Sequence, residues 1–385
     1  MNDVKFNLGQ GGLGRQLPND DHVTGFLFDV AQPTAFGTDK MLSFRSIEQV
    51  EAKGIIASDP TYALAHYTAK EFFRKHPEGL VFLGFQLTDA SIIINLSQGR
   101  IRQYGVFDSI ANIATYQTLM ENLRTQHAPA ICVIGATGIT DMGDSLQTPD
   151  LHTLDAEYVS VLVAGDGSAD GKALATSFGV PYVAAIGAVL GAMSSARVSD
   201  SIAWVKQYNY AVAQGELDEP IFADGDALSA YTSGDLDALN DKGYLFFRKF
   251  VGRSGSYLND TFSATVLTSD YAYIENNRTI QKAERLLYAA LLPEINSPLN
   301  VNPADGTLDV STIGYFESLC DKTLRENMLA NGELSGDEEN PGYTITIDPE
   351  QDVLGSGVLE VAVKLVPVGV AREIIVTLGF AVSVG

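Results

Sequence analysis

The chain has 385 residues, of which 45% are hydrophobic and 19% charged, as is typical of a globular protein with two or three domains. It carries 48 Asp and Glu against 25 Lys and Arg, a net charge of −23, which argues against nucleic acid or an anionic membrane as the main partner. In any homopolymer this charge would have to be tolerated, screened or locally offset. Cys132 and Cys320 lie at apolar positions and predict free core thiols in a reducing compartment.

No basic region followed by an apolar stretch opens the sequence, so no signal peptide is expected. The longest apolar window, residues 180–193, is too short and too rich in Gly and Ala to span a bilayer. We therefore expect a product that stays in the cytoplasm or leaves it only as part of a larger particle.

The N-terminal segment has the pattern of a single strand followed by a glycine-rich linker. Val4, Phe6 and Leu8 alternate with polar residues, which predicts a strand with one apolar face. A glycine-rich joint, GQGGLG at 9–14, separates it from the rest of the chain. A lone strand cannot fold by itself, so residues 1–20 are interpreted as an N-terminal arm that needs a sheet to join.

Residues 21–250 alternate between strands and helices, which predicts an α/β layer domain. Apolar runs predict strands at 23–30, 80–85, 91–96, 130–135 and 158–164. Asp59 and Pro60 predict an N-cap and a first helical residue for a helix running to about residue 76. A second helix is expected at 110–125, and the acidic, glycine-rich stretch 214–242 predicts an exposed loop or a small helical excursion.

The last 135 residues predict two amphipathic helices followed by strands. The helices are expected at 278–292 and 311–331, the second capped by Ser311 or Thr312 and ended by Gly332. Period-2 alternation predicts strands around 343–347, 359–365 and 376–384. We therefore expect a domain at 251–372, with a small mixed sheet flanked by helices, and a C-terminal arm strand at 373–385. The fold class is α/β (α+β), with extended arms at both ends.

Both chain ends are thus apolar strands with an open edge, which is an aggregation hazard without a defined partner. The strands could pair within one subunit or finish the C-terminal sheet. Alternatively each joins the sheet of a neighbouring subunit, where backbone hydrogen bonds supply affinity and the alternating side chains fix the register. Such an exchange extends into a ring or a helical lattice. The residues expected to hold it are Val4, Phe6, Leu8, Val376, Leu378, Phe380 and Val382.

The C-terminal third resembles the conserved domain of contractile tail sheath proteins of myophages, R-type pyocins and related injection systems. The matching stretches are YAYIENNRTIQKAERLL (271–287), MLANGELSG (328–336), GYTITIDPEQDV (342–353) and GVLEVAVKLVPVGVAREIIVTLGF (357–380). Upstream, residues 180–204 are similar to the sheath segment in which small residues and a turn follow a Pro. The W-G-x-R-T signature frequent in sheaths is missing, and the corresponding region reads SGSYLNDTF (254–262).

This resemblance implies a structural subunit of stacked hexameric rings around a tail tube. Its terminal arms would insert into neighbouring subunits, and contraction triggered at the baseplate would drive the tube into a target cell. Partners would be further copies, the tube protein, and baseplate and tail terminator proteins, in a virion tail or injection-system particle assembled in the bacterial cytoplasm. Another phage tail, tube or baseplate component with similar arms is the alternative within this class.

The best enzyme-like signal is the glycine loop at 165–172. It departs from a P-loop because Gly165 to Gly171 is one residue too long, Ala173 replaces Ser or Thr, and two Asp would repel phosphate. It also starts like a calcium loop, but the twelfth position is Ser177 rather than Glu. A simple βα turn is preferred over the alternative of a nucleotide-binding enzyme.

Other candidate sites are weaker. GATGITDMGD (135–144) follows a strand and could face a ligand, but glycines and Asp in a loop need no such explanation. The five histidines lack metal-ligand spacing and no G-x-S-x-G occurs. We expect no catalytic, metal or cofactor site. By family analogy Lys322 and Arg325 could contact the tube, whereas the simpler interpretation is an Asp321–Arg325 ion pair on one helix face.

Overall fold

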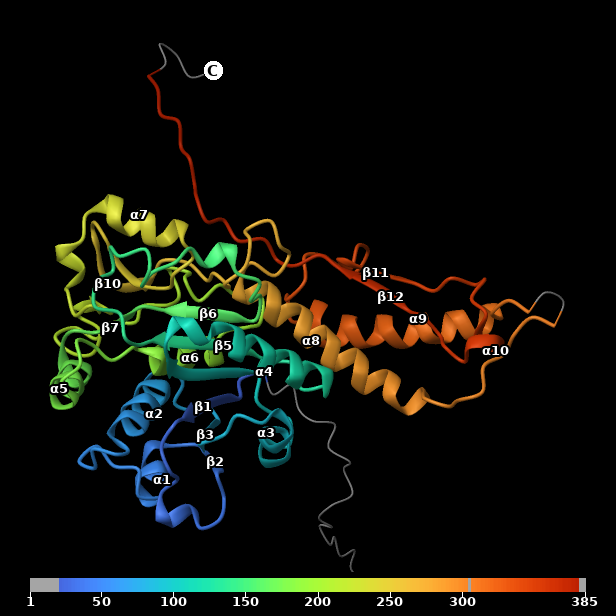
Figure 1. Ribbon diagram of the computed structural model, residues 1–385. Coiled ribbons are helices and arrows are strands. Elements are labelled where there is room, and N and C mark those ends of the chain that lie inside the picture. Colours follow the sequence, from blue (N-terminus) through green and yellow to red (C-terminus); the bar gives the residue numbers. More distant parts are fainter. Residues whose placement is uncertain (1–20, 304–305, 381–385) are drawn as a thin grey trace, which may run out of the picture.

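The computed structural model describes residues 21–303 and 306–380 (Figure 1). A large body is built on a six-stranded sheet, and a smaller helical domain extends from it along the long axis of the molecule (Figure 1). The expected α/β (α+β) class, with an α/β layer domain followed by a C-terminal domain, is confirmed. In the described part of the chain, no helix combines the length and the apolar character needed to cross a membrane.

The central sheet has the order β2-β3-β1-β4-β5-β6 and is parallel except for β2, which runs antiparallel to β3. Its strands are β1 (Thr24–Phe28), β2 (Met41–Phe44), β3 (Val81–Phe85), β4 (Gln103–Asp108), β5 (Ile131–Ala136) and β6 (Val159–Leu162). Leaving out β2, this is a doubly wound order whose direction reverses between β1 and β4. Every residue of β1, β3, β5 and β6 is buried, which explains the unbroken apolar runs in the sequence.

Two expectations about the elements of this domain are wrong. The run at 91–96 is not a strand but the centre of helix α3 (Ala90–Ser97), because Asp89 caps it through Ile92 N and Ile92 faces solvent. A short apolar run does not by itself distinguish a strand from a helix. Helix α2 (Ala63–Lys75) begins after a turn at 59–62, and Tyr62, not Asp59, is its N-cap.

Helices cover both faces of the sheet. The crossovers through α3 and α4 (Ile113–Thr125) move along the sheet in one direction, and the connection containing α1 (Ile47–Ala52) and α2 moves in the other, so the two sets lie on opposite faces. Helix α6 (Ile186–Ser195) packs between α2 and the sheet and is buried up to Ser194. A Cβ at Gly191 would lie 2.6 Å from the carbonyl oxygen of Phe72, so glycine is what lets α6 approach α2 this closely.

The rest of the body consists of short elements that extend its main core. They are β7 (Ala164–Asp166), α5 (Ala169–Phe178), β8 (Pro220–Phe222), α7 (Ser233–Asp241), β9 (Phe247–Phe250) and β10 (Arg253–Leu258). The stretch 214–242 contains the expected helical excursion as α7, together with β8. The main apolar core includes Phe262, Ala264 and Ile274, so packing of the body continues beyond the boundary expected near residue 250.

The C-terminal domain rests on two long helices. Its elements are α8 (Ile274–Leu291), α9 (Val310–Leu324), a π-helical turn (Arg325–Leu329), β11 (Tyr343–Thr346), α10 (Val353–Ser356) and β12 (Ala362–Leu365). In the described residues its sheet has two antiparallel strands, β11 and β12, and is not mixed. Asp309, rather than Ser311 or Thr312, is the N-cap of α9, because its carboxylate accepts from Ser311 N. Gly332, with φ of 67°, follows the end of the π-helical turn as expected.

Candidate functional site

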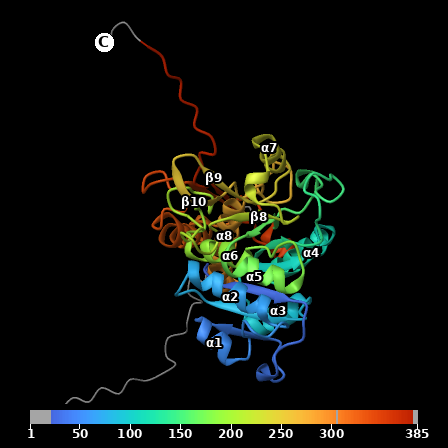
Figure 2. The same ribbon diagram turned by 90° about the vertical axis from the view of Figure 1, so that its left-hand side faces the viewer.

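The C-terminal segment, residues 373–380, leaves the body (Figure 1, Figure 2). Its apolar side chains are exposed to solvent. Val376, Leu378 and Phe380 are 69%, 90% and 110% exposed, and no strand of the described residues pairs with them. Ile374 and Ile375 are about as exposed. A run of large apolar side chains with an unpaired backbone requires a partner to be stable in water.

Arg372 fixes the point where this segment leaves the body. Its Nε lies 3.0 and 3.1 Å from the two carboxylate oxygens of Asp260, and its Nη2 donates to Glu275 at the start of α8. The guanidinium carbon stands 3.3 Å from the ring centre of Tyr273, a cation–π contact. One side chain therefore ties the C-terminal segment to the loop before α8 and to its first turn.

The two carboxyl groups that hold Arg372 are buried. Burial raises the pKa of Glu275, and Arg372 and Thr261 oppose that rise. Burial likewise raises the pKa of Asp260, again opposed by Arg372. Both pKa values stay above the usual range, so the carboxylates depend on Arg372 for their charge balance.

A second charged cluster joins the start of the described chain to the C-terminal domain. Lys282 Nζ lies 2.7 Å from Asp21 Oδ2 and 2.9 Å from Glu333 Oε1, and Arg285 also contacts Asp21. Burial raises the pKa of Asp21, but Arg285 and Lys282 outweigh it and leave the pKa below its usual value. Together with Arg278, Lys282 and Arg285 form a row of three cations on one face of α8, which we call the charged stripe.

Arg278 binds the end of a helix in the body. It donates to the carbonyl oxygen of Met193 in the last turn of α6, at 2.9 Å, and to those of Arg197 at 3.1 Å and Ala196 at 3.2 Å, just beyond the helix. A cation there satisfies carbonyls left without helical partners and complements the helix dipole. The stripe on α8 thus holds the body, the N-terminal end of the described chain and the turn at 331–333 in one arrangement.

Sequence reasoning missed the acidic partners in both clusters, Asp21, Asp260, Glu275 and Glu333. One signal was present: Arg278, Lys282 and Arg285 recur with a spacing of four and three residues on one face of an amphipathic helix in a chain of net charge −23. Such a stripe of cations predicts buried carboxylates opposite it.

The β11–β12 sheet offers open edges. Tyr343, Ile345, Val363 and Leu365 pack on α8 and α9, but within the described ranges neither strand has a second neighbour. A groove of about 400 Å³ runs beside β11, lined on the helix side by Gly314, Glu317, Ser318 and Asp321. Gly314 and Ser318 are the small residues of this lining, beside the carboxylates of Glu317 and Asp321.

The other predicted residues fall in two groups. Val4, Phe6, Leu8 and Val382, together with the joint at 9–14, lie outside the described residues. Lys322 is exposed on α9, while Arg325 makes the expected ion pair with Asp321 at 3.1 Å and donates to the carbonyl of Glu338. The contact with a tube remains a prediction for both.

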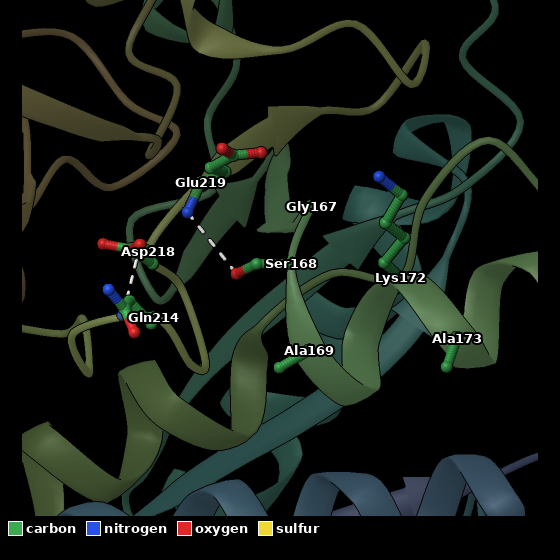
Figure 3. A pocket seen from close by; sticks show the side chains of 8 residues that line it. All are labelled: Gly167, Ser168, Ala169, Lys172, Ala173, Gln214, Asp218 and Glu219. Carbon is green, nitrogen blue, oxygen red and sulfur yellow. Dashed lines mark hydrogen bonds between the residues drawn. The ribbon is translucent and has the colours of Figure 1, made fainter.

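The glycine loop at 165–172 is a turn between β7 and α5. Asp166 accepts from Ser168 N at 3.0 Å and from Gly171 N at 3.4 Å, so its carboxylate occupies backbone donors that a P-loop would offer to phosphate. The neighbouring hollow, of about 500 Å³, is lined by Asp218 and Glu219 beside Ser168 (Figure 3). Among the described residues, no group of three or more His, Cys, Asp or Glu is arranged to hold a metal.

Two family models match the chain. The model described as "DUF2586, N-terminal domain" matches residues 104–262, and that described as "DUF2586, C-terminal domain" matches residues 270–385. No curated protein matches the sequence significantly.

Among solved structures, one described as "Cryo-EM structure of the anti-feeding prophage (AFP) baseplate, 6-fold symmetrised" contains a similar chain. It is 16% identical, with a TM-score of 0.64 over 99% of this chain and 100% of that chain, which establishes a common fold along the length of both. The two domain models match in chain order, so residues 104–262 are similar to the DUF2586 N-terminal domain and residues 270–385 to the DUF2586 C-terminal domain.

Proposed function

We propose that this chain is a structural subunit of a contractile injection system, and specifically a subunit of its contractile sheath. The observation that carries the proposal is the C-terminal segment, which Arg372 anchors at its base and which exposes five large apolar side chains beyond it. A second copy supplies a suitable acceptor, the open-edged β11–β12 sheet on α8 and α9. Strand addition at this sheet would cover the apolar side chains and pair their backbone.

The likeness to a chain of the anti-feeding prophage baseplate supports this class, because it extends over both chains from end to end. The sequence stretches that resemble sheath proteins supply residues of both clusters, including Arg278, Lys282, Glu333 and Arg372. In this proposal, copies form hexameric rings stacked around a tail tube, and the rigid bodies rotate during contraction while the arms stay engaged. Baseplate and terminator proteins would bind the two ends of the stack.

The test is assembly of truncated chains. Deletion of residues 374–385 should yield folded, monomeric protein, whereas the full chain forms rings or tubes visible by negative-stain electron microscopy. Deletion of residues 1–8 should act in the same way. Truncated chains that still build tubes of normal dimensions would show that the terminal arms do not hold the lattice.

A further inference from the structure

Charge is sharply segregated in the C-terminal domain. Residues 286–321 contain five Asp and Glu and no Lys, Arg or His, and residues 326–363 contain nine and again no basic residue. Between these ranges stand Lys322 and Arg325, of which Arg325 is paired with Asp321. Most of this domain beyond the charged stripe on α8 therefore presents only negative charge.

Four of these acidic residues, Asp348, Glu350, Asp352 and Glu360, lie in the segments on either side of α10, which stands at the free end of the domain (Figure 1). Pro349 O accepts from Leu308 N at 2.9 Å, and Gln351 Oε1 accepts from Glu360 N at 2.7 Å, so these segments lie together. Exposed apolar side chains accompany them: Ile295, Val310 and Leu354 are 64%, 82% and 72% exposed. We call this surface the acidic tip; its residues are Ile295, Val310, Asp348, Glu350, Asp352, Leu354 and Glu360.

The body carries the opposite surface. Residues 201–215 and 242–259 contain no Asp or Glu. They lie side by side, because Arg253 Nη2 donates to Val205 O and Tyr210 N donates to Ser256 O, both at 2.9 Å. We call the exposed part of this surface the basic patch; its residues are Trp204, Lys206, Arg248, Lys249, Val251 and Arg253.

The basic patch has the properties of a docking surface. Trp204 and Val251 are 46% and 108% exposed. Within the ranges that the structure describes, none of its four cations forms an ion pair. In a chain of net charge −23, two adjoining stretches without Asp or Glu that also expose aromatic and aliphatic side chains are unusual. Aromatic side chains and Arg are enriched at protein interfaces, and complementary charge steers the encounter.

We propose that the acidic tip of one copy docks on the basic patch of the next copy. The tip lies at one end of the long axis and the β9–β10 hairpin towards the other, so the contact is head-to-tail and propagates into a ring or a helix (Figure 1). This contact rests on the proposed function, because it assumes that copies assemble. It also offsets locally the repulsion that the net charge imposes on a polymer.

The test uses charge reversal on the full chain. One variant, Glu350→Lys with Glu360→Lys, reverses the tip; a second, Lys206→Glu with Lys249→Glu, reverses the patch. None of these four side chains caps a helix or makes an ion pair in the described part of the chain. The control, Glu338→Lys with Glu339→Lys, changes the net charge as the tip variant does, but beyond the opposite end of α9.

Self-association is measured by sedimentation velocity over a concentration series at low and high salt. The wild type should associate, and more weakly as salt rises. Each reversal should raise the apparent dissociation constant by about tenfold or more, since it replaces attraction with repulsion at two positions. The control variant should have an apparent dissociation constant close to that of the wild type. The chain carrying all four reversals has the wild-type net charge and should associate like the wild type, as should an equimolar mixture of the two double variants.

A wild type that remains monomeric overturns the contact, as does a failure of both the fourfold variant and the mixture to recover association. If the reversals have no effect while the arm truncations abolish assembly, the tip contact is wrong and the proposed function stands. If the reversals weaken assembly while the truncations leave it intact, the arm exchange is wrong and the tip contact stands.

Discussion

Replacing Arg372 with alanine removes the ion pairs with Asp260 and Glu275 and the cation–π contact with Tyr273 that tie the C-terminal segment to the start of α8. In the wild type, the guanidinium balances Asp260 and Glu275, whose side chains are 13% and 2% exposed. In the Arg372→Ala variant both carboxylates stay in place without a cation. We expect a less stable body and a C-terminal segment that is free from about residue 368 onwards.

The magnitude follows from the burial of the three side chains. Removing one partner of a fully buried ion pair costs about 3–5 kcal/mol. The Arg372 side chain is 28% exposed, so water reaches the site and screens part of the loss. We therefore expect the free energy of unfolding to fall by about 2–4 kcal/mol, a large share of the about 5–15 kcal/mol of a typical domain.

The loss should depend on pH. Burial raises the pKa of both carboxyls against the opposing effect of Arg372, and without Arg372 both pKa values rise further. An acid whose pKa is higher in the folded than in the unfolded state contributes stability that is present at low pH and lost as pH rises through the folded pKa. The deficit of the variant should thus be largest near neutral pH and shrink towards acid.

Urea unfolding at a series of pH values measures this deficit, and hydrogen exchange of residues 366–380 reports whether the segment is released. Arg372→Lys keeps the positive charge but loses the planar guanidinium with its paired donors. Its free energy of unfolding should therefore lie between those of Arg372→Ala and the wild type. An Arg372→Ala protein within about 0.5 kcal/mol of the wild type at neutral pH would refute the anchoring role, since surface substitutions have effects of that size.

Two further predictions concern the body. Gly191→Ala should lower the free energy of unfolding by about 1–3 kcal/mol, because its Cβ would overlap the backbone of α2; in urea denaturation, Gly314→Ala on the open face of α9 is the control that should not destabilise. Acid should destabilise the wild type through His76, whose pKa is lowered by burial and by His22, with Glu78 opposing. Above the usual value of 6.5 neither state is charged, and below it the unfolded state is protonated first, so stability falls until the pH passes the folded pKa. Thermal melts at pH 7.5 and 5.5 should show a smaller loss for His76→Gln, and an equal loss would contradict this assignment.

Local sequence patterns predicted most of the fold. Strands buried on both faces read as unbroken apolar runs, and the amphipathic helices of the C-terminal domain lie close to their expected positions. The run at 91–96 failed because its composition suits both structures, and the Asp89 cap decided for a helix. No local sequence pattern indicates the pairing of Asp21 with Arg285, because the two residues are 264 positions apart and come together only in the folded chain.

For the candidate site, the alternation at the C-terminus predicted which side chains stand exposed but not how the segment is held. The three cations of α8 are visible in the sequence, while their partners come from a loop, a turn and the start of the described chain. The acidic stretches and the acid-free stretches are also visible in the sequence, but only the structure places them at different ends of the molecule.

The position of Arg372 decides how the molecule withstands a pull on its C-terminus. Tension applied beyond residue 373 meets the ion pairs of Arg372 before it reaches β12, because β12 precedes Arg372 in the chain. Without these ion pairs, the four-residue ladder of β11 and β12 would open one rung at a time from its end. With them, the force passes into the first turn of α8, a helix that spans from the body into the C-terminal domain and shares strain along its length.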